Sequence, residues 1–339
     1  MTRRLFGVLS ILLAAAAPAA AQQSEWKDPS PHTTRFVTVA DSVQLEVLDW
    51  GGSGRVIILL AGLGDTGHVF DELAPMLTPR YRVLAVTRRG HGRSSAAPAG
   101  YGFARLAEDV MRVIEATGII NPVVIGHSIA GEELHVLGAR YPDKIAGVVY
   151  IDAAFNRSDG SNDYDAVART LPPAPRPAPA DLASFAALRS FLERNQGPAG
   201  PEAHLRARYI GNADGSVAGP WAPAAPIRQA MTAEMQAAFK EYNPEPIRVP
   251  ALAMYAVPKT PADLMRRWYP ANDSTVRQGV EKLFPLARQR FERHAKWFET
   301  FSGRGRVTEI SGAHHLFISN PRDVLEQIDA FVAALPRAP

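Results

Sequence analysis

The strongest constraint on the fold is the segment 121–131, which reads Asn-Pro-Val-Val-Ile-Gly-His-Ser-Ile-Ala-Gly. Its β-branched run, Val123–Ile125, predicts a short buried strand, and the residues after Gly131 follow a helical pattern. Ser128 lies between the two, with small residues two positions before and after it. A serine on such a sharp strand-to-helix turn adopts a strained backbone conformation that leaves its hydroxyl exposed. The segment therefore predicts a candidate nucleophile at a tight turn.

Strand-like and helix-like patterns alternate along most of the remaining chain. Predicted strands lie at 35–39, 43–49, 56–60, 81–86, 144–151, 249–255 and 306–310. Predicted helices lie at 69–77, 103–117, 131–141, 263–301 and 321–335. Such alternation is typical of βαβ units with right-handed crossovers. It predicts an α/β fold in which a mostly parallel sheet carries helices on both faces.

Residues 156–248 differ in composition, because they are rich in Pro, Ala, Gly and Arg and show no strand pattern. Helical segments are predicted at 181–196, 201–210 and 226–242. The segment is predicted to be a helical cap inserted into a core formed by 22–155 and 249–339. Its larger apolar residues either wall a pocket or pack the cap itself. They are Phe185, Phe191, Tyr209, Trp221, Met231, Met235 and Phe239.

The first 21 residues are typical of a secretory signal peptide. Arg3 and Arg4 precede the apolar run Leu5–Ala17, and Ala19–Ala21 offer a small-residue cleavage site. The run is short and Ala-rich for a membrane span, although an uncleaved anchor is the alternative. We therefore expect a periplasmic or secreted protein with no membrane span after cleavage.

Composition narrows the classes of function and cofactor. Of 339 residues, 46% are hydrophobic and 21% are charged, which is ordinary for a globular protein. Loss of the leader lowers the formal charge from +3 to about +1, so no nucleic-acid partner is expected. The chain has no cysteine, which removes disulfides and thiolate ligands. No H-E-x-x-H, dinucleotide or P-loop motif is present, so neither a metal nor a cofactor is expected.

Four segments, in order, resemble the motifs of the α/β-hydrolase fold superfamily. Ala61–Gly64 resembles its oxyanion loop, Arg89–Ser94 its structural turn, and Gly126–Gly131 its nucleophile elbow. Gly312–His315 lies where that family carries its catalytic histidine. The elbow has Ala130 at the position of the usual last glycine, which is a mild departure. The resemblance covers the chain from about residue 35 to its end.

The resemblance implies acyl transfer by a serine hydrolase without a cofactor. Ser128 would attack a carbonyl carbon while a histidine takes its proton. The backbone N–H groups of Leu63 and Ile129 would hold the oxyanion. The histidine that usually precedes this glycine in the family is replaced by Ala61, which leaves the backbone donors unchanged.

Two adjacent histidines compete for the role of the base. His315 is favoured because an apolar residue, Leu316, follows it, as in the family pattern. His314 falls at a position usually held by glycine and is interpreted as a loop residue that lines the pocket. His68 and His127 are further candidates for the wall of the pocket.

The acid is the least clear member, because the family's usual Gly-x-x-Asp turn is missing after the strand at 249–255. Asp152 ends a predicted strand at the edge of the sheet where active residues gather, and is favoured. Asp263 is the alternative. Glu132 and Glu133 are attributed to the helix dipole or to surface exposure.

These residues predict an exported serine hydrolase that cleaves a small-molecule carboxylic ester. The same triad could instead act on an amide, a lactone or a carbon–carbon bond. A binding protein that retained the fold without catalysis is a third hypothesis. Nothing in the sequence indicates an oligomeric state.

Overall fold

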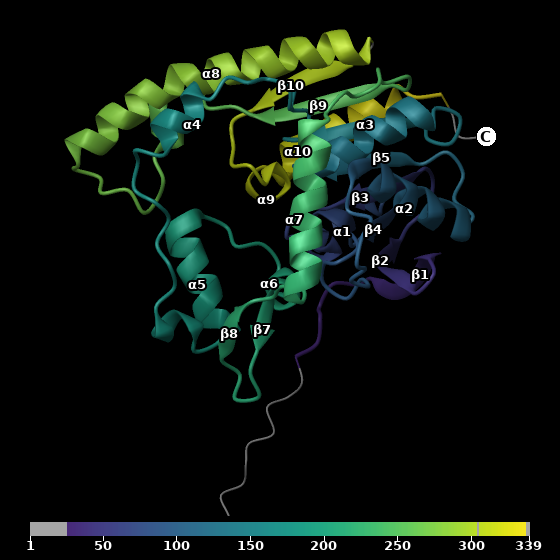
Figure 1. Ribbon diagram of the computed structural model, residues 1–339, viewed down its shortest axis with the longest axis horizontal. Helices are drawn as coiled ribbons and strands as arrows, with labels where there is room; N and C mark the ends of the chain where they lie inside the picture. The colour runs from purple at the N-terminus through teal and green to yellow at the C-terminus, as the bar shows by residue number, and fades with distance from the viewer. Residues whose placement is uncertain (1–25, 304, 337–339) are drawn as a thin grey trace, which may run out of the picture.

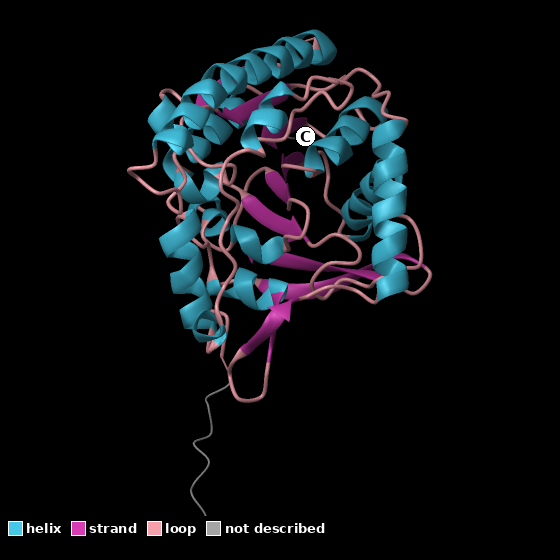
Figure 2. Ribbon diagram, turned by 60° about the vertical axis from the view of Figure 1, so that its left-hand side comes forward, coloured by secondary structure: helices cyan, strands magenta, loops and turns pink. Residues whose placement is uncertain are grey.

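The computed structural model describes residues 26–303 and 305–336, so the predicted leader lies outside the described residues. An eight-stranded sheet forms the centre, in the order β1-β2-β4-β3-β5-β6-β9-β10 (Figures 1 and 2). β2 pairs antiparallel with β1 and β4, and the other neighbours are parallel. The strands are β1 (Thr33–Ala40), β2 (Val43–Gly51), β3 (Val56–Leu60), β4 (Arg82–Val86), β5 (Val123–His127), β6 (Gly147–Ile151), β9 (Ala251–Ala256) and β10 (Arg306–Ile310).

Helices cover both faces of this sheet, as the alternating pattern predicts. One face packs on α2, α3 and α8, and the other packs on α1, α9 and α10. Strands β3, β5 and β6 are buried almost throughout, as expected of central parallel strands. The helices are α1 (Leu73–Leu77), α2 (Phe103–Ala116), α3 (Ala130–Arg140), α8 (Ser274–Ser302), α9 (Leu316–Ser319) and α10 (Pro321–Ala333), with short 3₁₀ turns at η1 (Gly67–Phe70) and η3 (Pro261–Leu264).

The chain between β6 and β9 forms four helices, a further 3₁₀ turn, η2 (Pro179–Leu182), and a small hairpin. The helices are α4 (Asp163–Ala168), α5 (Phe185–Gln196), α6 (Glu202–Arg208) and α7 (Ala225–Lys240). The expectation that this segment has no strands is wrong, because β7 (Tyr209–Gly211) pairs antiparallel with β8 (Val217–Pro220). The turn between them contains Asp214-Gly215, and Gly215 has a φ of 87°. Asp-Gly is a typical hairpin signal.

Some apolar residues of this inserted segment pack on one another, and others pack on the core. Phe185, Leu188, Phe191, Leu205 and Val217 form a separate small core. Met235 of α7 packs with Phe103, Leu106 and Ile129, and so joins α7 to α2 and to the residue after Ser128. No helix within residues 26–303 and 305–336 combines the length and the apolar character needed to span a bilayer.

Candidate active site

Ser128 lies on the sharp turn between β5 and α3. Its φ is 56°, in the left-handed region that a residue with a side chain rarely adopts. A methyl group at Gly126 would lie 3.0 Å from the Cβ of Ala130, and one at Gly131 would lie 2.0 Å from the carbonyl oxygen of Ala153. The second contact is impossible, whereas the alanine at position 130 is accommodated. The close approach of α3 to the segment after β6 therefore requires glycine at 131.

Asp152 directly follows β6, and two hydrogen bonds to β9 fix its position. Its backbone is also left-handed, with a φ of 46°, and its N–H donates to Met254 O at 2.7 Å. Its Oδ1 accepts a hydrogen bond from the backbone N–H of Ala256 at 3.0 Å. Both contacts are with β9, so the neighbouring strand fixes the direction of this carboxylate.

His314 joins these two residues. Its Nε2 lies 2.9 Å from Ser128 Oγ, and its Nδ1 lies 2.5 Å from Asp152 Oδ2. A carboxylate can only accept, so Nδ1 carries the proton and Nε2 is the acceptor for the serine hydroxyl. Serine, imidazole and carboxylate thus form one hydrogen-bonded series with the order of a catalytic triad.

The prediction that His315 occupies this position is wrong. Its Nε2 lies 3.1 Å from Asp65 Oδ2, on the side of the loop that follows β3. His314 and His315 are adjacent residues just before α9, and their side chains point in different directions. The register of this loop is fixed by Gly312, where a methyl group would lie 2.1 Å from Asn320 Oδ1. The small residues Gly312 and Ala313, directly before His314, were the feature of the sequence that could have favoured His314 over His315.

The alternative acid, Asp263, does not contact either histidine. Its Oδ2 accepts hydrogen bonds from the backbone N–H groups of Lys259 and Thr260 at 2.7 and 2.9 Å. It therefore caps the 3₁₀ turn η3, although it also lies at the wall of the cavity beside Ser128. The prediction of Asp152 as the histidine's partner agrees with the geometry.

The other two histidines predicted as pocket residues do not line the cavity that contains Ser128, whereas His314 does. His127 is buried, and its Nε2 lies 3.1 Å from the carbonyl oxygen of His314. Burial lowers the pKa of His127, so this ring stays neutral. His68 lies in η1 beside Asp71, and its Nδ1 is 3.1 Å from Asp71 Oδ2.

The loop Ala61–Gly64 is held by a buried ion pair that the sequence did not reveal. The Arg88 guanidinium donates to Ala61 O at 3.0 Å, to Gly62 O at 3.3 Å and to Glu133 Oε1 at 2.7 Å. Glu133 is 3% exposed, so its attribution to surface exposure is wrong, whereas its place in the first turn of α3 agrees with the helix-dipole alternative. Arg88 thereby connects the loop to the first turn of α3. The oxyanion donors, Leu63 and Ile129, remain predictions; Ile129 is the N-cap of α3, where N–H groups lack intrahelical acceptors.

Removing the Glu133 carboxylate is expected to destabilise the protein strongly. Glu133→Ala leaves the Arg88 guanidinium buried without its carboxylate, so the free energy of unfolding should fall by about 3–5 kcal/mol. Urea denaturation followed by circular dichroism measures the loss. Glu115→Ala is the matched control, because its pair with Arg112 is exposed and should contribute less than about 1 kcal/mol. Equal losses in the two variants would contradict this account.

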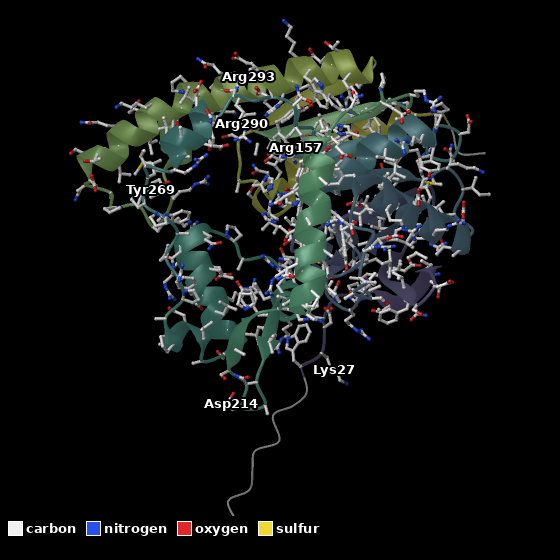
Figure 3. The ribbon with its side chains drawn as sticks, viewed as in Figure 1. Lys27, Arg157, Asp214, Tyr269, Arg290 and Arg293 are labelled. Atoms are coloured by element: carbon white, nitrogen blue, oxygen red, sulfur yellow. The ribbon has the colours of Figure 1, made fainter. Side chains whose placement is uncertain are left out.

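A cavity of about 390 Å³ opens beside Ser128, Asp152 and His314. Its aromatic walls are Phe155, Tyr164, Tyr255 and Phe291, and its basic side chains are Arg157, Arg266 and Arg290. Arg157 and Arg290 are labelled in Figure 3. None of the apolar cap residues predicted as possible walls lines this cavity. A larger cavity of about 500 Å³, lined by residues of α2, α3 and α7, does not include Ser128.

Part of the sequence is similar to known hydrolases. Residues 55–199 match the profile of the α/β-hydrolase fold family. A serine hydrolase-like protein from Danio rerio is 38% identical over 106 residues, which cover 30% of this chain and 32% of that protein. A bifunctional esterase/perhydrolase from Acinetobacter calcoaceticus is 36% identical over 121 residues, covering 35% of this chain and 44% of that one. The chain thus matches less than half the length of these curated relatives.

Similarity of the fold extends over nearly the whole chain. A crystal structure of E-2-(acetamidomethylene)succinate hydrolase aligns with a TM-score of 0.59 and 20% sequence identity, over 89% of this chain and 100% of that one. At this identity the likeness concerns the fold. The sequence match includes the loop after β3, the turn at Arg89–Ser94 and the elbow, and the fold match covers 89% of the chain. Together they show that the chain has the α/β-hydrolase fold and that residues 55–199 match the sequence profile of that family.

Proposed function

We propose that the protein is an exported serine hydrolase that cleaves carboxylic esters through an acyl-enzyme. The observation that carries the proposal is the hydrogen-bonded series from Ser128 Oγ through His314 to Asp152. Similar segments in a serine hydrolase-like protein and in an esterase/perhydrolase support it. Export rests on the leader sequence, and sequencing of the mature N-terminus should find Gln22 as the first residue.

In the proposed mechanism, Ser128 Oγ attacks the ester carbonyl carbon while His314 Nε2 takes its proton. The backbone N–H groups of Ile129 and Leu63 would stabilise the resulting oxyanion. His314 then returns the proton to the leaving alcohol as the C–O bond breaks. A water molecule, activated by the same imidazole, hydrolyses the acyl-enzyme and restores the serine. Asp152 keeps the proton on Nδ1 and stabilises the imidazolium that forms.

Covalent labelling separates a hydrolase from a binding protein on the same fold. A fluorophosphonate should add one label per chain at Ser128, found by mass spectrometry of the digested protein. Ser128→Ala should remain unlabelled. Ser311→Ala, in the loop that carries His314, should be labelled like the wild type, since no catalytic role is proposed for it. An unlabelled wild-type protein would contradict the proposal, and a panel of ester, amide and lactone substrates would distinguish the bond types.

The cavity favours a substrate that carries a negative charge. Three arginines line it against two carboxylates, Asp152 and Asp263. Arg157 is already paired with Glu132 at 2.7 Å. Arg290 reaches Asp165 only at 3.4 Å in an exposed pair, and its guanidinium lies 5.1 Å from the centre of the Tyr164 ring. Arg266 forms no ion pair within the described part of the chain. Arg266 and Arg290 are thus available to a carboxylate.

We expect the mono-4-nitrophenyl ester of adipic acid to be hydrolysed with a higher kcat/KM than 4-nitrophenyl hexanoate, its uncharged counterpart. A hydrogen bond to a charged group contributes about 1.5–3 kcal/mol, which corresponds to a preference of roughly 10- to 100-fold. Arg290→Gln should reduce this ratio, mainly through KM. Arg293→Gln is the matched control, since Arg293 lies one turn further along α8 and pairs with Asp159. A ratio near one for the wild type would exclude the preference.

A further inference from the structure

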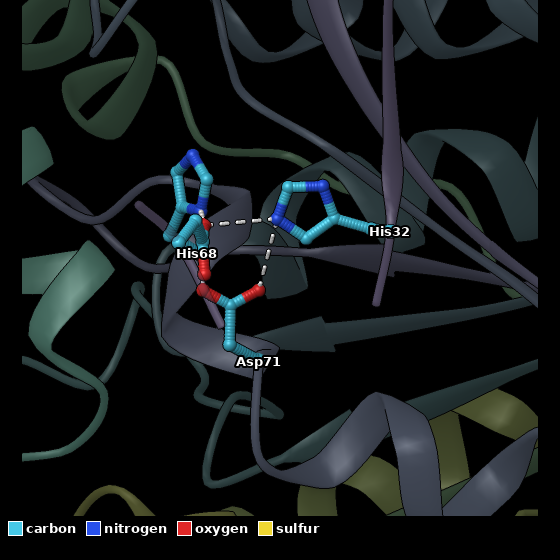
Figure 4. Close-up of side chains that lie close together, drawn as sticks. His32, His68 and Asp71 are labelled. Atoms are coloured by element: carbon cyan, nitrogen blue, oxygen red, sulfur yellow. Dashed lines mark hydrogen bonds and ion pairs between the residues drawn. The ribbon is translucent and has the colours of Figure 1, made fainter. Parts of the chain in front are cut away.

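Four potential metal ligands from two segments that lie far apart in the sequence come together in the fold. Asp28 and His32 precede β1, His68 lies in η1, and Asp71 follows it; Figure 4 shows three of them. One ligand atom from each residue lies within 4.8 Å of all the others. The side chains of His32 and Asp71 are 6% and 4% exposed, while Asp28, at 21%, leaves a route for an ion from solvent.

The distances within this cluster match those around a tetrahedral ion. His32 Nε2 lies 3.1 Å from Asp28 Oδ2 and 3.5 Å from Asp71 Oδ1. His68 Nδ1 lies 3.2 Å from Asp28 Oδ2 and 3.1 Å from Asp71 Oδ2. Zinc bonds of about 2.0–2.1 Å at the tetrahedral angle place neighbouring ligand atoms about 3.3–3.4 Å apart. The three contacts at 3.1–3.2 Å are close to that spacing, and Asp71 presents Oδ1 to His32 and Oδ2 to His68.

Hydrogen bonding alone does not satisfy these groups. His68 Nδ1 lies 3.2 Å from Asp28 Oδ2 and 3.1 Å from Asp71 Oδ2, so its single N–H proton would have to be shared between two carboxylates. Asp71 Oδ1 is buried and has no hydrogen-bond partner among the described residues. Metal ligation requires neutral imidazoles, and two carboxylates beside two neutral rings would carry a charge of −2, which one divalent cation neutralises. In residues 26–303 and 305–336, neither carboxylate forms an ion pair with lysine or arginine.

We propose that Asp28, His32, His68 and Asp71 form a structural zinc site with two imidazole and two carboxylate ligands. Four protein ligands around one ion are typical of a structural site, because no position is left open for a substrate. The sequence predicted no metal, since the ligands have no H-E-x-x-H spacing and come together only in the fold. A bound ion would tie the segment before β1 to η1, just after the loop Ala61–Gly64.

A second cluster is a poorer cation site. Asp65, His127 and His315 also bring ligand atoms together. There, however, the Arg208 guanidinium lies 3.4 Å from Asp65 Oδ1 and already supplies positive charge. Burial alone would raise the pKa of Asp65, but the hydrogen bond from His315 and the nearby Arg208 guanidinium hold it well below its usual range. This carboxylate is therefore satisfied without a metal, and its variants serve as controls.

Zinc titration of the chelator-treated protein tests the proposal. Isothermal calorimetry and elemental analysis after dialysis should find one Zn²⁺ per chain, and X-ray absorption should show only N and O ligands at about 2.0–2.1 Å. Zinc in about 100-fold excess over its Kd should raise Tm by about 5 °C. Asp71→Asn and His68→Gln should weaken binding by about 100-fold or more, whereas Asp65→Asn and His315→Gln should retain one ion.

Circular dichroism first establishes that each variant is folded. If Asp71→Asn does not fold, His32→Gln keeps three ligands and should still bind zinc at least about 10-fold more weakly than the wild type. A wild-type Kd weaker than about 100 µM would overturn the proposal. So would retention of zinc by Asp71→Asn together with its loss from Asp65→Asn, because the ion would then occupy the other cluster. Zinc that no variant affects would be adventitious, with the same consequence.

Discussion

His314→Gln should lower kcat/KM for ester hydrolysis by about 10⁴- to 10⁶-fold, whereas His315→Gln should retain it within about 10-fold. The large loss is expected because His314 Nε2 is the only imidazole nitrogen shown within hydrogen-bond distance of Ser128 Oγ among the described residues. Without it, no group takes the hydroxyl proton, and losses of this size are typical of triad histidines. His315 contacts Asp65, and glutamine keeps an N–H donor for that carboxylate.

The two variants form a matched pair, since they exchange the same residue type at adjacent positions. Initial rates with 4-nitrophenyl acetate across several concentrations give kcat and KM separately. Fluorophosphonate labelling of Ser128 should fall in parallel with kcat in the His314 variant. A larger loss in the His315 variant would show that the loop adopts a different register during catalysis and that His315 is the general base.

Asp152→Asn is expected to lower kcat by about 10⁴-fold, with the fold retained. An amide NH₂ in place of Oδ2 would donate to Nδ1, so the imidazole proton would move to Nε2. A protonated Nε2 cannot accept the serine proton, although the ring keeps its place. The loss should be partly relieved at high pH, where hydroxide competes for the serine proton.

Asp263→Asn is the control for the acid. Its side-chain oxygen would still accept the hydrogen bonds from Lys259 and Thr260, so kcat should stay within about threefold of the wild type. Stopped-flow or steady-state assays at pH 7 to 10 measure both variants. If Asp263→Asn were the more damaging change, the carboxylate that orients His314 in the working enzyme would not be Asp152.

Local sequence patterns predicted most strands and helices of the core, because each of these elements has a characteristic pattern of apolar residues. The apolar run Val56–Leu60 forms β3 as predicted, and the elbow at Ser128 has the expected strand before it and helix after it. Asp152 was found because the ends of parallel strands meet at one edge of the sheet. These inferences depend on short-range periodicity and on the fixed hand of βαβ units, and both can be read from a single chain.

The wrong predictions concern two things: the direction in which a loop side chain points, and contacts between residues that are far apart in the sequence. His314 and His315 are adjacent residues in a loop. The contact between Gly312 and Asn320 fixes which of them faces Ser128, and this contact produces no periodic pattern in the sequence. Glu133 looks like a surface residue near a helix start until Arg88, from 45 residues earlier, is placed against it. The possible zinc ligands are likewise invisible as a set, because Asp28 and Asp71 come together only when β1 and η1 have packed.

The three residues of the proposed triad are positioned by different parts of the fold. Ser128 and Asp152 follow neighbouring strands, and α3 lies so close to Ala153 that the two halves cannot shift independently. His314 instead belongs to a loop beyond the last strand, and its side chain is 46% exposed. His314 is therefore the most exposed member of the proposed triad, and we expect thermal inactivation to begin with displacement of its ring while the sheet is still intact.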